Sequence, residues 1–271
     1  MNPFGRLREF VACANALGPD TRAKCALLWH QTKNVRARLR LASWRPDRIY
    51  ALDTVYGRLW FRDNFGDITN LPGLLHREVY RPAHAPGDGA ILDVGANIGL
   101  AAAWFAHRYP GRPIHCFEPL AANTAMIARN CPHARINQVG VGSEPGTIQL
   151  EVDADSIMAT SIPTRWQTAS IAVPLIRLDD YVAEQGIERV AFLKIDTEGM
   201  ELDVLRGAPA TLRMTDQVAL ETHAAFRHRE VQEVLRSAGF RIEREAFDGE
   251  TGMVFADRQD GHPGHPATAR V

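Results

Sequence analysis

The stretch Ile91-Leu92-Asp93-Val94-Gly95-Ala96-Asn97-Ile98-Gly99 decides how this chain is expected to fold. Its first residues form a compact apolar run that ends at Gly95, and residues 99–109 have the apolar spacing of a helix. Gly95 allows the chain to turn sharply and lets a ligand approach the backbone, and Gly99 lets the helix begin close to the sheet. A buried strand, a glycine turn and a helix together form the opening unit of an α/β sheet.

Strands and helices are expected to alternate after this turn. The expected strands are 114–117, 136–141, 190–195 and 218–220, and the expected helices are 120–130, one from Leu178, 201–205 and 230–237. Continuous apolar strands followed by helices are typical of a parallel sheet covered on both faces. Residues 147–152 predict an antiparallel excursion, and residues 241–245 and 253–256 predict an antiparallel pair.

The residues before the glycine turn have a different sequence pattern. Residues 6–17 and 22–41 predict helices, residues 49–61 predict a strand pair that turns near Gly57, and a short helix is expected within 71–80. Residues 1–48 hold ten Lys or Arg against three acidic residues, a net charge of +7, so the rest of the chain carries −8.

These differences divide the chain into three parts. We expect an N-terminal helical cap over residues 1–80, the main α/β domain over 81–258 and a flexible tail over 259–271. The loop 156–170, rich in small and polar residues and carrying Trp166, is a candidate lid.

Composition excludes several classes of protein. With 271 residues, 45% of them hydrophobic, the chain is typical of a globular protein, and a formal net charge of −1 argues against a strongly basic nucleic-acid binder. No apolar run approaches the roughly 18 residues of a membrane span. The four cysteines have no CxxC spacing, and no export signal is recognised, so a cytoplasmic location is expected. A homo-oligomer stays open.

The glycine turn favours a cationic nucleoside ligand over a phosphate ligand. The dinucleotide fingerprint needs a glycine where Asn97 stands, and the P-loop lysine is absent. Asp93 suits an ammonium or sulfonium group and repels a pyrophosphate. Glu118 ends the second strand, where a carboxylate can accept hydrogen bonds from both hydroxyls of a ribose. NAD contains the same ribose, so a dehydrogenase stays open as a weaker alternative.

Charged side chains are expected to gather at the ends of the fourth and fifth strands. Lys194-Ile195-Asp196-Thr197-Glu198-Gly199 ends one, and Leu220-Glu221-Thr222-His223 ends the other. The carboxyl ends of strands line the ligand crevice of an open α/β sheet, so these groups are expected to converge. They are sufficient for a general base, a divalent-cation site or both. His223 is the natural base because its unperturbed pKa lies near neutrality.

In this order the motifs resemble the FkbM family of S-adenosylmethionine-dependent methyltransferases, from about Leu75 to about Glu245. The resemblance rests on Asp93–Gly99, Phe117-Glu118-Pro119, Leu193–Gly199 with Glu201 and Leu205, and Glu221-Thr222-His223. It implies a class I methyltransferase, Rossmann-like fold: a seven-strand, mostly parallel sheet with an antiparallel last strand. It also implies O-methylation of a small-molecule hydroxyl. Family substrates include natural-product polyketides and sugars. Gly140 stands where the family usually has alanine.

The resemblance also implies a role for each matching residue. It places four residues around the methionine part of S-adenosylmethionine: Asp93, Gly95, Asn97 and Gly99. Glu118 would hold the ribose, and Val141 or Ser143 would lie near the adenine. Asp196 would face the methyl group. Relatives of this family use a magnesium ion. The resemblance therefore implies that Asp196 and Glu221 could hold a Mg²⁺ ion here. A non-catalytic module that only binds the cofactor stays open, although the retained Asp196, Glu221 and His223 favour an enzyme.

Overall fold

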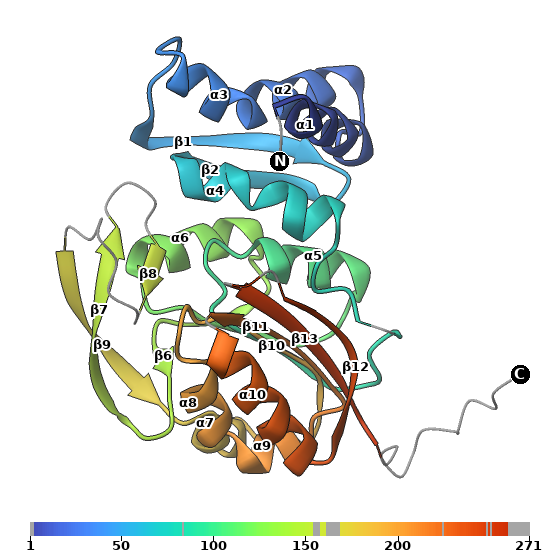
Figure 1. Cartoon of the computed structure of the whole chain (residues 1–271), viewed down its shortest axis with the longest axis vertical. Coiled ribbons are helices and arrows are strands. Elements are labelled where there is room, and N and C mark those ends of the chain that lie inside the picture. The colour runs from blue at the N-terminus through green and yellow to red at the C-terminus, as the bar shows by residue number, and fades with distance from the viewer. Residues whose placement is uncertain are drawn as a thin grey trace, which may run out of the picture.

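The computed structural model describes residues 3–82, 84–153, 158–160, 169–223, 225–247, 249 and 251–259. Three parts are stacked in it: an N-terminal layer, a seven-strand sheet with helices on its faces, and a smaller four-strand sheet at one side (Figure 1). Residues 154–157, 161–168 and 260–271 lie outside the described residues, and they include Trp166 of the expected lid and almost all of the expected tail.

The N-terminal layer contains helices and one strand pair. Its elements are α1 (Pro3–Leu17), α2 (Thr21–Gln31), α3 (Lys33–Arg38), β1 (Arg45–Thr54), β2 (Gly57–Asp63), α4 (Phe65–Thr69) and the π-helical turn η1 (Pro72–His76). The expected strand pair is confirmed, with Thr54 opposite Gly57 at its turn. The helix expected over 22–41 is divided at Thr32, whose hydroxyl donates to the Leu28 carbonyl oxygen at 2.9 Å.

The main sheet has the expected seven strands. In chain order they are β3 (Ala90–Val94), β4 (Ile114–Phe117), β5 (Arg135–Asn137), β10 (Val190–Ile195), β11 (Gln217–His223), β12 (Phe240–Phe247) and β13 (Thr251–Arg258). Their order across the sheet is β12-β13-β11-β10-β3-β4-β5. The strands β3, β4, β5, β10 and β11 are parallel, and β13 is antiparallel to both neighbours. The chain order reverses beside β3, which is the position where open α/β sheets bind ligands.

Helices cover both faces of this sheet (Figure 1). They are α5 (Leu100–Arg108), α6 (Ala121–Asn130), α7 (Leu178–Glu184), α8 (Glu201–Arg206), α9 (Pro209–Arg213) and α10 (Ala225–Ser237). On the α5 face the sheet shares one continuous core with the N-terminal layer, in which Leu27 and Phe61 belong to the same buried cluster as Phe105. Burial of these apolar side chains is what holds the layer against the sheet.

The third expected strand, 136–141, is wrong as a single element. Residues 135–137 form β5 in the main sheet, whereas Gly140–Val141 form β6 in the smaller sheet, whose strand order is β6-β9-β7-β8. The remaining strands of that sheet are β7 (Gly146–Asp153), β8 (Met158–Thr160) and β9 (Ala169–Ile176). The ladder ends because β4 stops at Phe117, opposite Asn137, so the following residues pair with β9 instead.

The two glycines of the opening turn are needed for reasons that the sequence did not show. Gly95 has φ +79°, and a Cβ there would stand 1.7 Å from the carbonyl oxygen of Asp196. Gly99 has φ +82°, and a Cβ there would stand 3.1 Å from the Cα of Ile127 in α6. Gly99 therefore also lets α5 begin close to α6.

Candidate active site

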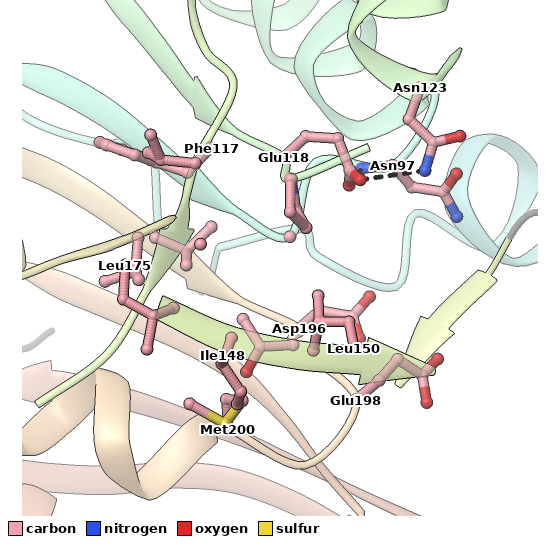
Figure 2. Close-up of a pocket in the computed structure, with 17 residues that line it drawn as sticks. Asn97, Phe117, Glu118, Asn123, Ile148, Leu150, Leu175, Asp196, Glu198 and Met200 are labelled. Atoms are coloured by element: carbon pink, nitrogen blue, oxygen red, sulfur yellow. Dashed lines mark hydrogen bonds between the residues drawn. The ribbon is translucent and has the colours of Figure 1, made fainter. Parts of the chain in front are cut away.

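A pocket opens at the carboxyl ends of β3 and β4 and encloses about 750 Å³, part of it open to solvent. Figure 2 shows Glu118, Asn97 and Asn123 on one side of it and Asp196, Glu198 and Met200 on the other. We refer to it as the β3–β4 pocket.

Glu118 is buried at one end of the β3–β4 pocket and is held by three N–H donors. The backbone N–H of Asn97 donates to its Oε2 at 2.9 Å, while Leu120 N–H and Asn123 Nδ2 donate to its Oε1 at 3.0 Å and 3.1 Å. Burial raises the pKa of Glu118, and these hydrogen bonds partly offset that rise. A carboxylate has about four acceptor positions, so about one stays available to a ligand.

An apolar wall of the β3–β4 pocket comes from the smaller sheet. This wall was not predicted from the sequence as part of a site. It is formed by Val139, Gly140, Val141, Ile148, Leu150 and Leu175. Of these, only Val141 was among the expected cofactor-binding residues. The alternation of Ile148 and Leu150 along β7 was a usable signal, because residues two apart on a strand face the same side.

Lys194 and Asp93 form a buried ion pair beneath this end of the sheet. Asp93 is 0% exposed, and its Oδ1 lies 3.0 Å from Lys194 Nζ. Lys194 also donates to the Gly95 carbonyl oxygen at 2.6 Å. Burial alone would lower the pKa of Lys194, but Asp93 and Asp196 outweigh it and raise that pKa, so the lysine stays charged. Asp93 thus faces a protein cation and does not line the β3–β4 pocket.

Asp196 and Glu221 are joined by a tyrosine that the sequence analysis did not single out. The hydroxyl of Tyr80 lies 2.8 Å from Asp196 Oδ2 and 3.1 Å from Glu221 Oε2. Burial and these two carboxylates raise the pKa of Tyr80 well above its ordinary value, so the hydroxyl keeps its proton. One hydroxyl proton can be donated to only one carboxylate at a time, so a proton on Glu221 completes the chain of hydrogen bonds.

His223 is held between two glutamates. Its Nδ1 lies 2.9 Å from Glu201 Oε1, and its Nε2 lies 3.3 Å from Glu198 Oε2. Glu201 is fully buried and also accepts a hydrogen bond from the Gly199 N–H at 2.7 Å. Burial lowers the pKa of His223, but the Glu201 hydrogen bond and the charges of Glu198 and Asp196 outweigh it and raise the pKa to about 9.

The carboxylates at this end outnumber the cations, and this excess shifts their protonation. Burial, followed by the charge of Asp196, raises the pKa of both Glu198 and Glu221 to about 7, while His223 opposes the shift. An added positive charge in the cleft would lower both values, since an opposite charge favours the ionised form. This end of the site is therefore suited to a cationic ligand.

Among the described residues, one group of three possible metal ligands differs from the expected Asp196–Glu221 pair. Asp196, Glu198 and His223 bring their ligand atoms within 4.8 Å of one another, whereas Glu221 contacts Asp196 through Tyr80. Magnesium prefers oxygen ligands in octahedral geometry, and an imidazole suits other divalent metals better. Magnesium is commonly bound through one or two carboxylates, with water completing its coordination, so the Asp196–Glu221 site stays a prediction.

A second cavity adjoins the first on the side of the N-terminal layer. Its walls include Thr69, Asn70, Leu74, Arg77 and Tyr80 from that layer, with Asp196, Glu198 and Glu221 from the main sheet. Gly95, Asn97, Asp196 and Glu198 line both cavities. The two spaces therefore meet at Asp196.

The structure gathers most of the expected site residues, although four line neither cavity. Gly95, Asn97, Glu118, Val141 and Asp196 line the β3–β4 pocket, and Glu221 lines the second cavity. The other four are Asp93, Gly99, Ser143 and His223. Asp93 pairs with Lys194, and Gly99 packs on Ile127.

The chain is similar to known methyltransferases. The family model described as "Methyltransferase FkbM domain" matches residues 93–242. Methyltransferase sdnD of Sordaria araneosa is 25% identical over 78% of this chain and 93% of its own length. The 31-O-demethyl-FK506 methyltransferase FkbM of Streptomyces tacrolimicus is 30% identical over 58% and 74%. The 2-O-methyltransferase NoeI of Sinorhizobium fredii is 29% identical over 52% and 65%.

Among solved structures, the fibrillarin pre-rRNA processing protein of Methanococcus jannaschii is similar with a TM-score of 0.47. The similarity covers 79% of this chain and 84% of that one at 11% sequence identity. A similarity of this size carries no argument about function.

Proposed function

The chain belongs to the FkbM methyltransferase family, and from that premise we propose that it transfers the methyl group of S-adenosylmethionine to a hydroxyl of a small molecule, a natural product or a sugar. The observation that carries the proposal is the position of Asp196, which lines both adjoining cavities. A base at such a junction contacts the acceptor and the cofactor together. The relatives FkbM and NoeI carry O-methylation in their names, which is consistent with an oxygen acceptor.

In this proposal the β3–β4 pocket receives the cofactor. Glu118 accepts a hydrogen bond from one ribose hydroxyl, because its three protein donors leave about one acceptor position. The adenine lies against the apolar wall that includes Val141 and Ile148. Asp196 and Glu198 face the sulfonium, whose positive charge their carboxylates stabilise.

The second cavity receives the acceptor, and Asp196 takes its proton. An alcohol is a poor nucleophile at neutral pH, so its proton has to leave as the new bond forms. The acceptor oxygen attacks the methyl carbon in line with the C–S bond, which breaks and leaves a neutral thioether. The acceptor proton moves to Asp196. When Glu221 is ionised, the Tyr80 hydroxyl gives its own proton to Glu221 and takes the one on Asp196, so the tyrosine ends the step unchanged. The charge lost at sulfur balances the charge lost at the carboxylate.

His223 has a different role from the expected one in this proposal. With its pKa raised to about 9, its ring is protonated at neutral pH and has no lone pair for the acceptor. The imidazolium holds Glu198 in place. Together with Lys194, its positive charge offsets the repulsion among the carboxylates of the cluster. His223 is thus a positioning residue, and the general base is Asp196.

The test is a product assay with matched variants. Wild-type protein is incubated with S-adenosylmethionine and a panel of hydroxylated sugars, polyols and polyketides, and S-adenosylhomocysteine and methylated products are identified by mass spectrometry. We expect O-methylation by wild type, a loss of about 10²-fold or more in kcat for Asp196→Asn, and a smaller loss for His223→Ala. A larger loss for His223→Ala returns the role of base to the histidine.

Two results would contradict the proposal as a whole. Methyl transfer to nitrogen or carbon in place of oxygen would change the acceptor class. Calorimetric binding of S-adenosylmethionine with no product on the entire panel would favour the non-catalytic binding module instead.

A further inference from the structure

Basic residues are concentrated in one segment of the N-terminal layer, and the proposed reaction does not use them. Residues 21–49 contain eight Lys or Arg and one acidic residue, Asp47, for a net charge of +7, while the remaining residues carry −8. Figure 1 places α3 and the beginning of β1 at the outer edge of this layer, away from α8 and α10 on the main sheet. This segment is therefore strongly basic, while the rest of the chain is acidic on balance.

Large apolar side chains are exposed within this basic region. Trp29, Val35, Leu39 and Leu41 have exposed fractions of 60%, 45%, 63% and 72%. Such side chains on a monomer surface mark an interaction site when they gather in one place. Arginines are interleaved with them in the sequence, at positions 36, 38, 40, 45 and 48.

Contacts within the region bring several of these residues close together. The guanidinium of Arg36 lies 3.5 Å from the centroid of the Trp29 ring, and Leu41 N–H donates to the Arg36 carbonyl oxygen at 2.8 Å. Val35 and Leu39 are one helical turn apart, with Leu39 N–H donating to the Val35 carbonyl oxygen at 3.1 Å. We call this surface the α3 patch: Trp29, Val35, Arg36, Leu39, Arg40, Leu41, Arg45 and Arg48.

We propose that the α3 patch docks the protein on an anionic lipid bilayer surface. Arginine with exposed tryptophan and leucine is the composition of segments that lie in the headgroup region, where the ring and the aliphatic chains enter the interface and the cations meet lipid phosphates. The net charge of −8 on the rest of the chain is repelled by the same surface, so the field turns the α3 patch toward the membrane.

The docking is peripheral. None of the helices in the described part of the chain is both long enough and apolar enough to cross a membrane. A projecting helix end and the turn after it need no complementary groove to enter a headgroup layer, whereas a protein partner would have to supply one. The bilayer is therefore the occupant that the exposed side chains fit best.

The experiment is cosedimentation of the full chain with vesicles of phosphatidylcholine alone and of phosphatidylcholine with phosphatidylserine. We expect binding only to the anionic vesicles, weakening as salt is added, because salt screens the attraction. The variants Leu39→Ser/Leu41→Ser and Arg40→Glu/Arg48→Glu should each lower the partition coefficient about tenfold or more, since each basic residue near an anionic surface and each buried apolar group adds to binding.

Matched control variants carry the same kinds of change elsewhere on the surface. Leu7→Ser and Arg229→Glu alter exposed residues outside the α3 patch and should leave vesicle binding unchanged. Equal binding to neutral vesicles, no binding to either kind, or patch variants that bind as wild type does would overturn the proposal. In the second case, an acidic protein becomes the partner to look for. Methyltransferase activity in solution should be the same in all four variants.

Discussion

The two ends of the crevice at the carboxyl ends of the strands hold their acidic groups in opposite ways. At one end a single carboxylate, Glu118, is held by three neutral N–H donors. At the other end, within the described part of the chain, the carboxylates of Asp196, Glu198 and Glu221 contact cations such as Lys194 and His223 and the hydroxyl of Tyr80.

This difference shows what each end is suited to do. Neutral donors fix one carboxylate in one position, which suits recognition of hydroxyls on a ligand. In the crowded cluster the pKa values of Glu198 and Glu221 are both about 7. At neutral pH these two groups therefore gain and lose protons with only a small change in free energy. In our proposal the first end binds and the second end reacts.

Gly95 is where the two ends meet, so its substitution should have the largest effect. The variant Gly95→Ala places a methyl group 1.7 Å from the Asp196 carbonyl oxygen. We expect loss of folded protein or a severe drop in Tm by thermal unfolding. Gly57→Ala is the control: Gly57 also has positive φ, but nothing lies within 4 Å of its added Cβ, so only about 1–2 kcal/mol should be lost. Equal losses in the two variants would remove the steric explanation.

Glu118→Gln tests the binding end by itself. The amide keeps the shape of the side chain but loses the charge, and its NH₂ cannot accept the donors that now surround it. The affinity for S-adenosylmethionine should fall about 10- to 100-fold, the size expected for a charged hydrogen bond. Calorimetry measures it, with circular dichroism as the control for folding. Unchanged affinity would mean that this end does not hold the ribose.

Tyr80→Phe tests the reacting end. The variant removes the hydroxyl between Asp196 and Glu221 and changes little else. We expect kcat to fall about tenfold, less than the ~10²-fold that loss of a general base costs, while cofactor affinity stays the same. The dependence of kcat on pH near 7 should also disappear. A structural role alone would lower Tm and leave that pH profile in place.

The smallest expected effect is the pH dependence of cofactor binding. Glu198 and Glu221 lose their protons as the pH rises through about 7, and the charges that appear favour a cation. The Kd of S-adenosylmethionine should therefore decrease several-fold across this range, with calorimetry at each pH as the measurement. S-adenosylhomocysteine has no sulfonium charge and should respond less. An equal response of the two ligands would place the sulfonium away from the cluster.

The order of apolar strands and helices along the chain predicted a parallel sheet and the strand ends at which Glu118, Asp196, Glu221 and His223 stand, while the number of seven strands was implied by the resemblance to the FkbM family. This worked because burial on both faces requires continuous apolar strands, and parallel strands bring their carboxyl ends to one edge. The division of residues 135–141 between two sheets was not predictable from that run, because a strand can continue only as far as its neighbour does.

By itself, then, the sequence determined the type of sheet, the position of the crevice and the kinds of groups that line it, since these depend on local periodicity. Only the tertiary structure decided which group meets which. Tyr80 lies 116 residues from Asp196 and 141 from Glu221, and Asp93 turns out to face Lys194. Such pairings depend on how distant segments pack, and the protonation of Glu198, Glu221 and His223 follows from that packing.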